Sequence, residues 1–298
     1  MKIGKIIQSL SGFYDVISDG KIYRTRARGN FRKRNIKPLV GDLIEFKSTN
    51  SNDGYVLKVL KRRNQLLRPL ISNVDQAIVV TSVKQPDFSF NLLDRQLIAL
   101  AIQHIQPIIY FTKTDLINDD QFHKIKLVAD YYLSIGYIVI LSRESFMDSN
   151  LKRLKDNFKN KEVTVMGQTG AGKSTLLNHI MPDLNLKTGV ISKSLHRGKH
   201  TTRRVALLNI NNGLVADTPG FSSYEALNID YRHLKDYFPE FVNNENKCRF
   251  RECLHVKEPH CAIKSMVDNG EIMKSRYDDY IQLFEGLKNQ KPIYNKKK

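Results

Sequence analysis

The octapeptide Gly167-Gln168-Thr169-Gly170-Ala171-Gly172-Lys173-Ser174 decides the fold class of this chain. It fits the phosphate-binding pattern G-x-x-x-x-G-K-[ST] at every fixed position, and its glycines allow the backbone to wrap around phosphate oxygens. A β-branched candidate strand, residues 162–166, precedes it, and a run of helix formers, residues 173–180, follows it. A chance match would seldom have these flanks, so the sequence predicts a P-loop between a strand and a helix.

Three further motifs accompany the P-loop in an unusual order. Thr112-Lys113-Thr114-Asp115 fits the [N/T]-K-x-D loop that reads guanine in GTPases, yet it precedes the P-loop. His200-Thr201-Thr202 and the D-x-x-G motif Asp217-Thr218-Pro219-Gly220 both follow it. In an ordinary GTPase the base-reading loop comes last. The order therefore predicts a circularly permuted GTPase that binds GTP and GDP.

The base-reading residues are expected in two loops. The Asp115 carboxylate can accept from guanine N1–H and the exocyclic amine, a donor pair that adenine lacks, and Lys113 would lie over the base plane. Thr112 stands where Asn is usual, and its hydroxyl can still bond locally. Ser142 is the candidate for the second loop, where the usual Ser-Ala-Lys appears as Ser142-Arg143-Glu144.

The phosphate and Mg²⁺ ligands follow from the motifs. Lys173 is expected to reach the β- and γ-phosphates, and Thr175 joins the P-loop in contacting them. Ser174, Thr202 and Asp217 are the expected Mg²⁺ ligands, with the choice between Thr201 and Thr202 open. The Gly220 N–H would sense the γ-phosphate.

Catalysis is expected to involve Lys173, Thr202 and, as a candidate, His200. Phe221 follows Gly220, where many GTPases place a glutamine that orients the attacking water, and a phenyl ring cannot do this. Either His200 or a partner positions the water; the alternative for His200 is a solvated loop histidine.

All three cysteines lie in one short segment. Cys248, Cys253, His255 and Cys261 follow C-x4-C-x-H-x5-C, and three thiolates with one imidazole make a closed, structural Zn²⁺ site. His260 is a rival ligand, although its adjacency to Cys261 makes joint tetrahedral coordination awkward.

Charge and hydropathy indicate a cytoplasmic protein that contacts polyanions. The 298 residues carry a net charge of +18, and residues 1–68 hold 16 Lys and Arg against 5 Asp and Glu, a local charge of +11. Such an excess attracts nucleic acid by counterion release, although a solvated basic surface is the alternative. The apolar runs are too short to cross a bilayer, and the first residues have no signal-peptide pattern.

The chain divides into three expected domains, 1–68, 69–225 and 226–298. Five short candidate strands, 5–8, 13–17, 21–27, 43–47 and 55–60, predict an OB-fold barrel. Basic residues interleaved with Tyr23 and Phe31 suit RNA: Arg24, Arg26, Arg28, Arg32, Lys33 and Arg34. Alternating strands and helices predict a parallel α/β core, with loops of the site at strand carboxyl ends. A final helix is expected over 264–290.

The combination resembles the ribosome small-subunit-dependent GTPase A family of circularly permuted bacterial GTPases. The likeness spans nearly the whole chain. It includes 26–33, 40–42, 68–69, 73–76, 92–95, the P-loop, 200–203, 217–221 and the four cysteine and histidine positions. The resemblance implies an OB-fold, a permuted GTPase and a zinc domain. It also implies late maturation of the small ribosomal subunit, contact with its rRNA and stimulation of GTP hydrolysis by that subunit. We expect the protein to be a monomer.

Two other functions compete with this interpretation. A P-loop ATPase or nucleotide kinase would not need Asp115 or the D-x-x-G motif. A non-enzymatic RNA-binding scaffold would not need Lys173, Ser174 and Asp217 together.

Overall fold

The computed structural model describes residues 1–27, 29, 31, 36–67, 69–182, 206–217 and 227–290. Several residues named above lie outside these ranges: Arg28, Arg32, Lys33, Arg34, His200, Thr201, Thr202, Gly220 and Phe221. The side chain of Asp217 is also not described. None of the helices in the described ranges combines the length and hydrophobicity of a bilayer-spanning segment.

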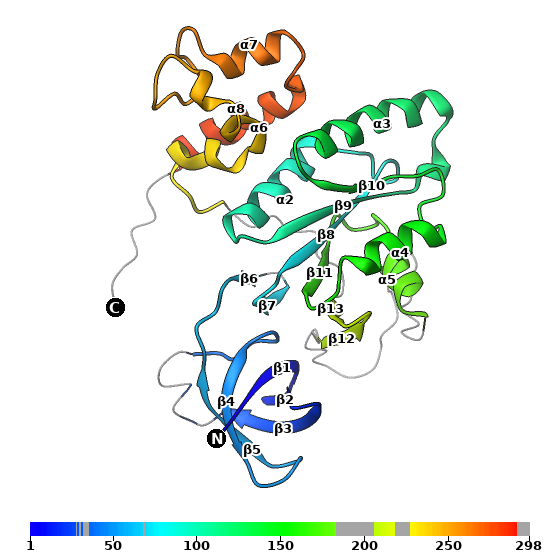
Figure 1. The fold of residues 1–298 in the computed structure, drawn as a ribbon, viewed down its shortest axis with the longest axis vertical. Coiled ribbons are helices and arrows are strands. Elements are labelled where there is room, and N and C mark those ends of the chain that lie inside the picture. Colours follow the sequence, from blue (N-terminus) through cyan, green and yellow to red (C-terminus); the bar gives the residue numbers. More distant parts are fainter. Residues whose placement is uncertain are drawn as a thin grey trace.

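The N-terminal segment forms a closed five-stranded barrel (Figure 1). Its strands are β1 (Lys2–Leu10), β2 (Phe13–Ser18), β3 (Lys21–Ala27), β4 (Leu43–Ser48) and β5 (Gly54–Val59). They pair in the order β1-β2-β3-β5-β4, and β4 pairs again with β1. Ile6, Val16, Ile44, Phe46 and Val56 fill the interior and are fully buried. The expected barrel is confirmed. A short hairpin, β6 (Gln65–Leu67) and β7 (Leu70–Ser72), follows it.

The central region is a mostly parallel sheet in the order β10-β9-β8-β11-β13-β12. The strands are β8 (Gln76–Ser82), β9 (Gln106–Thr112), β10 (Ile138–Ile140), β11 (Glu162–Met166), β12 (Ala206–Ile210) and β13 (Gly213–Asp217). β12 alone among these runs antiparallel, to β13. The sheet confirms the expected α/β fold. The loops that carry the candidate motifs leave β9, β10, β11 and β13 at their carboxyl ends, where ligand sites of such sheets lie.

Helices cover both faces of this sheet. α2 (Phe90–Ile102) and α3 (Asp119–Ser134) pack on one face, against Ile109 and Phe111. α4 (Asp148–Asp156) and α5 (Lys173–Ile180) pack on the other, against Ile108 and Tyr110. The alternation along β9 follows from the two-residue period of a strand and leaves it apolar on both faces. A capping box of Asn118 and Gln121 fixes the start of α3.

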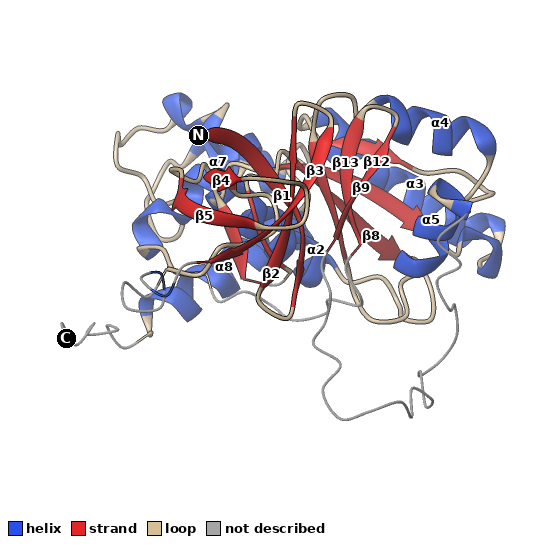
Figure 2. Ribbon diagram, turned by 90° about the horizontal axis from the view of Figure 1, so that it is seen from below, coloured by secondary structure: helices blue, strands red, loops and turns tan. Residues whose placement is uncertain are grey.

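The barrel joins the central sheet by strand pairing. β1 lies antiparallel to β12, with Gln8 opposite Ala206, so the barrel strands continue the sheet into one array of eleven. Figure 2 shows the strands of the two regions as neighbouring groups. β12 is the first described element after the predicted switch threonines.

The C-terminal region is helical and packs on α2 (Figure 1). It contains the 3₁₀ segments η3 (Tyr231–Tyr237) and η4 (Glu245–Lys247) and the helices α6 (Pro239–Val242), α7 (Ala262–Asp268) and α8 (Lys274–Lys288). The single helix expected over 264–290 is therefore wrong. Gly270 has a φ of +78°, a left-handed conformation that ends α7, and α8 starts a few residues later.

A buried ionic cluster ties this region to the core. Arg276 of α8 is fully buried and bonds both Asp94 of α2 and Glu240 of α6, the latter at 2.5 Å from Nε to Oε1. The Tyr132 hydroxyl of α3 donates to Asp94 at 2.6 Å. Burial raises the pKa of Asp94 to about 6, although the Arg276 guanidinium opposes this shift. If the region detached, Asp94 would lose its cation and Arg276 would lose one of its two carboxylate partners.

Candidate nucleotide site and metal centre

The P-loop lies between β11 and α5, and two of its glycines are required by the backbone. A Cβ on Gly167 would come within 2.2 Å of the Val80 carbonyl oxygen of the neighbouring strand. Gly172, which caps α5, has a φ of +94°. Larger residues would displace β8 at the first position and strain the backbone at the second. Ser174 and Thr175 consequently lie in the first turn of α5, where N–H groups favour an anion.

Lys173 lies folded along the P-loop. Its Nζ donates to the carbonyl oxygens of Gly167 and Gln168, each at 2.7 Å. Burial lowers the pKa of this ammonium group to about 8. The cation is thus held beside the P-loop backbone, where phosphate oxygens would compensate its charge.

The expected base-reading loop contacts the P-loop directly. The Thr112 hydroxyl, which is fully buried, donates to the Ala171 carbonyl at 2.6 Å. This bond uses the proton of the hydroxyl, so Thr112 positions one loop against the other in this structure. Lys113 has a left-handed φ of 60°, and its Nζ donates to the Gln85 carbonyl. The Asp115 side chain is exposed at the same edge of the sheet.

The second base loop follows β10. The Ser142 hydroxyl donates to the Glu144 carbonyl at 2.6 Å and accepts from Asn150 Nδ2 at 2.5 Å. The adjacent Ser145 is buried and contacts Thr114 of the first loop. Ser145 and Thr114 therefore join the loop after β10 to the loop after β9. The sequence motifs did not predict this contact.

Of the three expected Mg²⁺ ligands, the described residues include Ser174 and Asp217. Asp217 ends β13, which pairs with β11, so the backbone places it beside the strand that leads into the P-loop. Thr202, the third expected ligand, lies outside the described ranges together with Thr201, Gly220 and the candidate His200.

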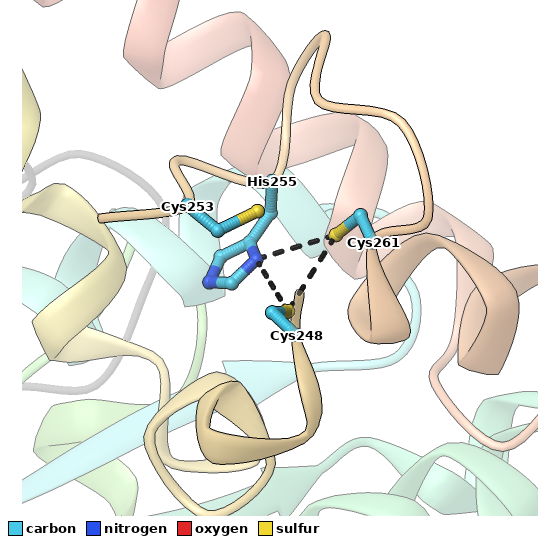
Figure 3. A group of neighbouring side chains, drawn as sticks. All are labelled: Cys248, Cys253, His255 and Cys261. Atoms are coloured by element: carbon cyan, nitrogen blue, oxygen red, sulfur yellow. Dashed lines mark hydrogen bonds between the residues drawn. The ribbon is translucent and has the colours of Figure 1, made fainter. Parts of the chain in front are cut away.

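The four predicted metal ligands converge on one point (Figure 3). One ligand atom of each of Cys248, Cys253, His255 and Cys261 lies within 4.8 Å of the others. His255 Nδ1 is 3.6 Å from Cys248 Sγ and 3.4 Å from Cys261 Sγ, and these two sulfurs are 4.0 Å apart. Zn–S bonds of about 2.3 Å would set sulfurs about 3.8 Å apart in a tetrahedron. The group therefore fits zinc, whereas His260 is exposed.

Burial sets the protonation of this group. It lowers the pKa of His255 to about 4, so the imidazole is neutral and able to coordinate. It raises the pKa of the Cys253 thiol to about 12, and that of Cys261 above its ordinary value. A divalent cation would displace these thiol protons, which is the usual coupling between metal binding and pKa.

Neighbouring residues hold the metal-ligand loop in shape. The Glu258 carboxylate accepts from the backbone N–H groups of Leu254 and Val256, each at 2.9 Å. The hydroxyls of Tyr277 and Tyr280 on α8 donate to the carbonyls of His255 and Leu254 at 2.7 and 2.5 Å. The loop is thus anchored to the helix that carries Arg276.

Comparisons with known proteins match the whole architecture. The model of the RsgA GTPase family matches residues 59–227, that of the RsgA N-terminal domain matches 3–56, and that of the 50S ribosome-binding GTPase family matches 162–294. A protein of Limosilactobacillus reuteri, described as the small ribosomal subunit biogenesis GTPase RsgA, is 58% identical over 99% of this chain and all of its own.

Two solved structures share the fold. The circularly permuted GTPase YloQ is 40% identical, with a TM-score of 0.82 over 99% of this chain and 97% of its own. YjeQ from Thermotoga maritima is 32% identical, with a TM-score of 0.81 over 97% of this chain and 99% of its own. The barrel, the permuted order of the motifs and the cysteine-histidine group agree with these matches, and the chain belongs to the RsgA GTPase family of GTP hydrolases.

Proposed function

We propose that this protein binds the small ribosomal subunit through its rRNA and acts in late maturation of that subunit, hydrolysing GTP under stimulation by it. It would act in the cytoplasm as a monomer. The relatives named for small ribosomal subunit biogenesis support the subunit as the partner. In this proposal Asp115 reads guanine, Lys173 stabilises the phosphates, and Ser174, Thr202 and Asp217 hold Mg²⁺. The cysteine-histidine group holds one structural Zn²⁺.

A row of side chains on the barrel exterior carries the RNA part of the proposal. Phe13, Arg26, Tyr55 and Lys47 lie opposite one another on the successive strands β2, β3, β5 and β4. Phe13 is 36% exposed and Tyr55 is 40% exposed, so part of each ring faces solvent.

The guanidinium groups of Arg24 and Arg26 each lie 5.4 Å from the centre of the Phe13 ring. Aromatic faces beside cations suit stacked bases and backbone phosphates, as in single-stranded RNA. The exposed ion pair of Arg26 with Asp53, at 3.5 Å, is weak enough for a phosphate to replace it.

GTP hydrolysis with and without purified small subunits tests the proposal. The double variant Phe13→Ala/Arg26→Ala should keep its basal hydrolysis and lose most of the stimulation by subunits. Lys126→Ala/Leu127→Ala on α3 removes an exposed cation and an exposed apolar side chain elsewhere and should behave as wild type. Wild-type protein that is not stimulated by small subunits would contradict the ribosomal function. Full stimulation of the barrel variant would contradict only the role of the exterior barrel side chains in RNA binding.

A further inference from the structure

We propose that three buried hydroxyl groups, those of Tyr110, Thr114 and Ser145, select guanine by holding the loop of residues 142–145 where its backbone amides can donate to the base O6 atom. They act as positioning residues and do not themselves touch the nucleotide. The inference rests on the proposed base site, in which Asp115 reads the opposite part of the same edge of the base.

The three hydroxyls form a directed chain of hydrogen bonds. Thr114 Oγ1 donates to the Arg143 carbonyl at 2.9 Å, which uses its one proton. The 2.9 Å contact between Thr114 Oγ1 and Ser145 Oγ must then be donated by Ser145. The Tyr110 hydroxyl in turn donates to the Ser145 carbonyl. Arg143 and Ser145, on both sides of Glu144, are thereby fixed to the strand and loop that carry Asp115.

The chain lies in the protein interior. Tyr110 and Thr114 are fully buried and Ser145 is 5% exposed, so water is poorly placed to replace a lost partner. Burial raises the pKa of Tyr110 to about 12, which keeps its hydroxyl protonated as a donor near neutral pH. Loss of one hydroxyl should therefore release the loop rather than be compensated by solvent.

Aromatic contacts fix the same loop to the phosphate site. The Phe146 ring stacks on Tyr110 with centroids 6.4 Å apart. Its other stacking partner is His179 of α5, at 4.6 Å and an interplanar angle of 11°. Because α5 begins at the P-loop, the loop that would meet the base is held at a set distance from the phosphates.

Backbone amides are the donors this loop offers. The Ser142 hydroxyl is already committed to Glu144 and Asn150. Within the described part of the chain, the N–H groups of Arg143 and Glu144 donate to no protein acceptor. An N–H donor matches the O6 acceptor of guanine and repels the amino group that adenine carries there. Asp115 reads N1–H and the 2-amino group, so the two loops read different atoms.

Two nucleotide analogues probe these contributions. Inosine triphosphate keeps O6 and N1–H and lacks the 2-amino group, whereas 2,6-diaminopurine riboside triphosphate keeps the 2-amino group, replaces O6 by an amine and has no N1–H. The variants below leave Asp115 in place, so a change in their discrimination against the diaminopurine nucleotide reports on the O6 contact. Wild-type protein should bind GTP more tightly than either. Thr114→Val, Ser145→Ala and Tyr110→Phe should each reduce the discrimination against the diaminopurine nucleotide at least tenfold, while the ratio for inosine triphosphate stays within twofold. Competition against a fluorescent GDP analogue measures all three affinities.

Matched variants make the test decisive. Thr164→Val removes another buried threonine hydroxyl, one that has no hydrogen-bond partner within the described residues, and should leave both ratios unchanged. Thr114→Ser keeps a hydroxyl and should restore discrimination. Thermal unfolding checks that each variant is folded.

The outcomes distinguish the inference from the site on which it rests. Equal weakening for all three nucleotides would show that the hydroxyls only support the fold, and an unchanged ratio in folded Thr114→Val would also overturn the inference. Wild-type protein that binds ATP as tightly as GTP would instead refute the base site itself.

Discussion

Lys5 of the barrel pairs with Glu162, the first residue of the strand that leads into the P-loop. The Glu162 side chain is buried, with one carboxylate oxygen that has no partner within the described residues. Burial raises the pKa of Glu162 to about 7, while the Lys5 ammonium opposes the shift. The junction between barrel and core thus contains a carboxyl that titrates near neutral pH.

This pKa predicts a pH-dependent stability. Between pH 4.5, the ordinary pKa, and about pH 7, the folded protein keeps a proton on Glu162 that the unfolded chain releases. The contribution of Glu162 to the free energy of unfolding therefore falls as the pH rises to about 7. Glu162→Gln should remove this pH-dependent loss of unfolding free energy, which is on the order of 1–3 kcal/mol. Thermal unfolding from pH 5 to 8 should show a shallower decline for this variant than for wild type or for the exposed control Glu285→Gln. Parallel pH profiles for all three proteins would refute the prediction.

The lowered pKa of Lys173 predicts weaker GTP binding at high pH. In the free protein the ammonium loses its proton above about pH 8, whereas bound phosphate would retain it. Affinity should therefore fall by up to about tenfold per pH unit above that value. Lys173→Ala should bind GTP weakly and should not show the fall in affinity that deprotonation of Lys173 causes. Titration of guanine itself affects both proteins equally. Fluorescent GTP binding between pH 7 and 9.5 measures the difference, and identical profiles would contradict it.

The cysteine-histidine group predicts one zinc ion per chain. Cys253→Ser should lose the metal, because the three remaining ligands no longer close the tetrahedron, and residues 248–261 should lose hydrogen-exchange protection before the nucleotide-binding core does. His260→Ala should retain stoichiometric zinc. Metal analysis with hydrogen exchange is the measurement. Zinc that stays bound without the cysteines, or that is lost in His260→Ala, would contradict the assignment of the four ligands.

Removal of Arg276 should be strongly destabilising. Arg276→Ala leaves the Asp94 and Glu240 carboxylates buried together without a cation, and breaking such a pair commonly costs about 3–5 kcal/mol. Lys274→Ala breaks an exposed pair with Asp278 on the same helix and should cost less than about 1 kcal/mol. Chemical denaturation compares them. Equal, small losses would mean that the buried cluster contributes little.

The predicted catalytic histidine is tested by turnover. If His200 orients the water in place of the missing glutamine, His200→Ala should still bind small subunits with GTP and lose most subunit-stimulated hydrolysis. The loss should be on the order of 10²-fold, typical of general acid-base groups. His123→Ala, on the exposed part of α3, is the control. Full stimulation of His200→Ala would assign the role to the ribosome or to another residue.

The strongly patterned parts of the fold could be predicted from the sequence. The P-loop and its flanking strand and helix follow from local pattern, and the cysteine spacing identified a group that the fold brings together. The chain of hydrogen bonds through Tyr110, Thr114 and Ser145 could not be predicted, because contacts between two loops leave no periodic signal in the sequence. Arg276 likewise looks like an exposed helix charge until its partners on α2 and α6 are known. The break at Gly270 was available in principle, because an Asn-Gly pair favours a helix end.

The pairing of Gln8 with Ala206 makes the barrel the next neighbour of strand β12 at the edge of the nucleotide-binding sheet. The C-terminal region is attached through the buried ion pairs of Arg276, whereas the barrel meets the nucleotide-binding sheet through this strand pairing and the Lys5–Glu162 ion pair. If GTP shifts β12 and thereby changes the affinity of the barrel for a partner, thermodynamic reciprocity requires that the partner change the affinity for GTP by the same factor.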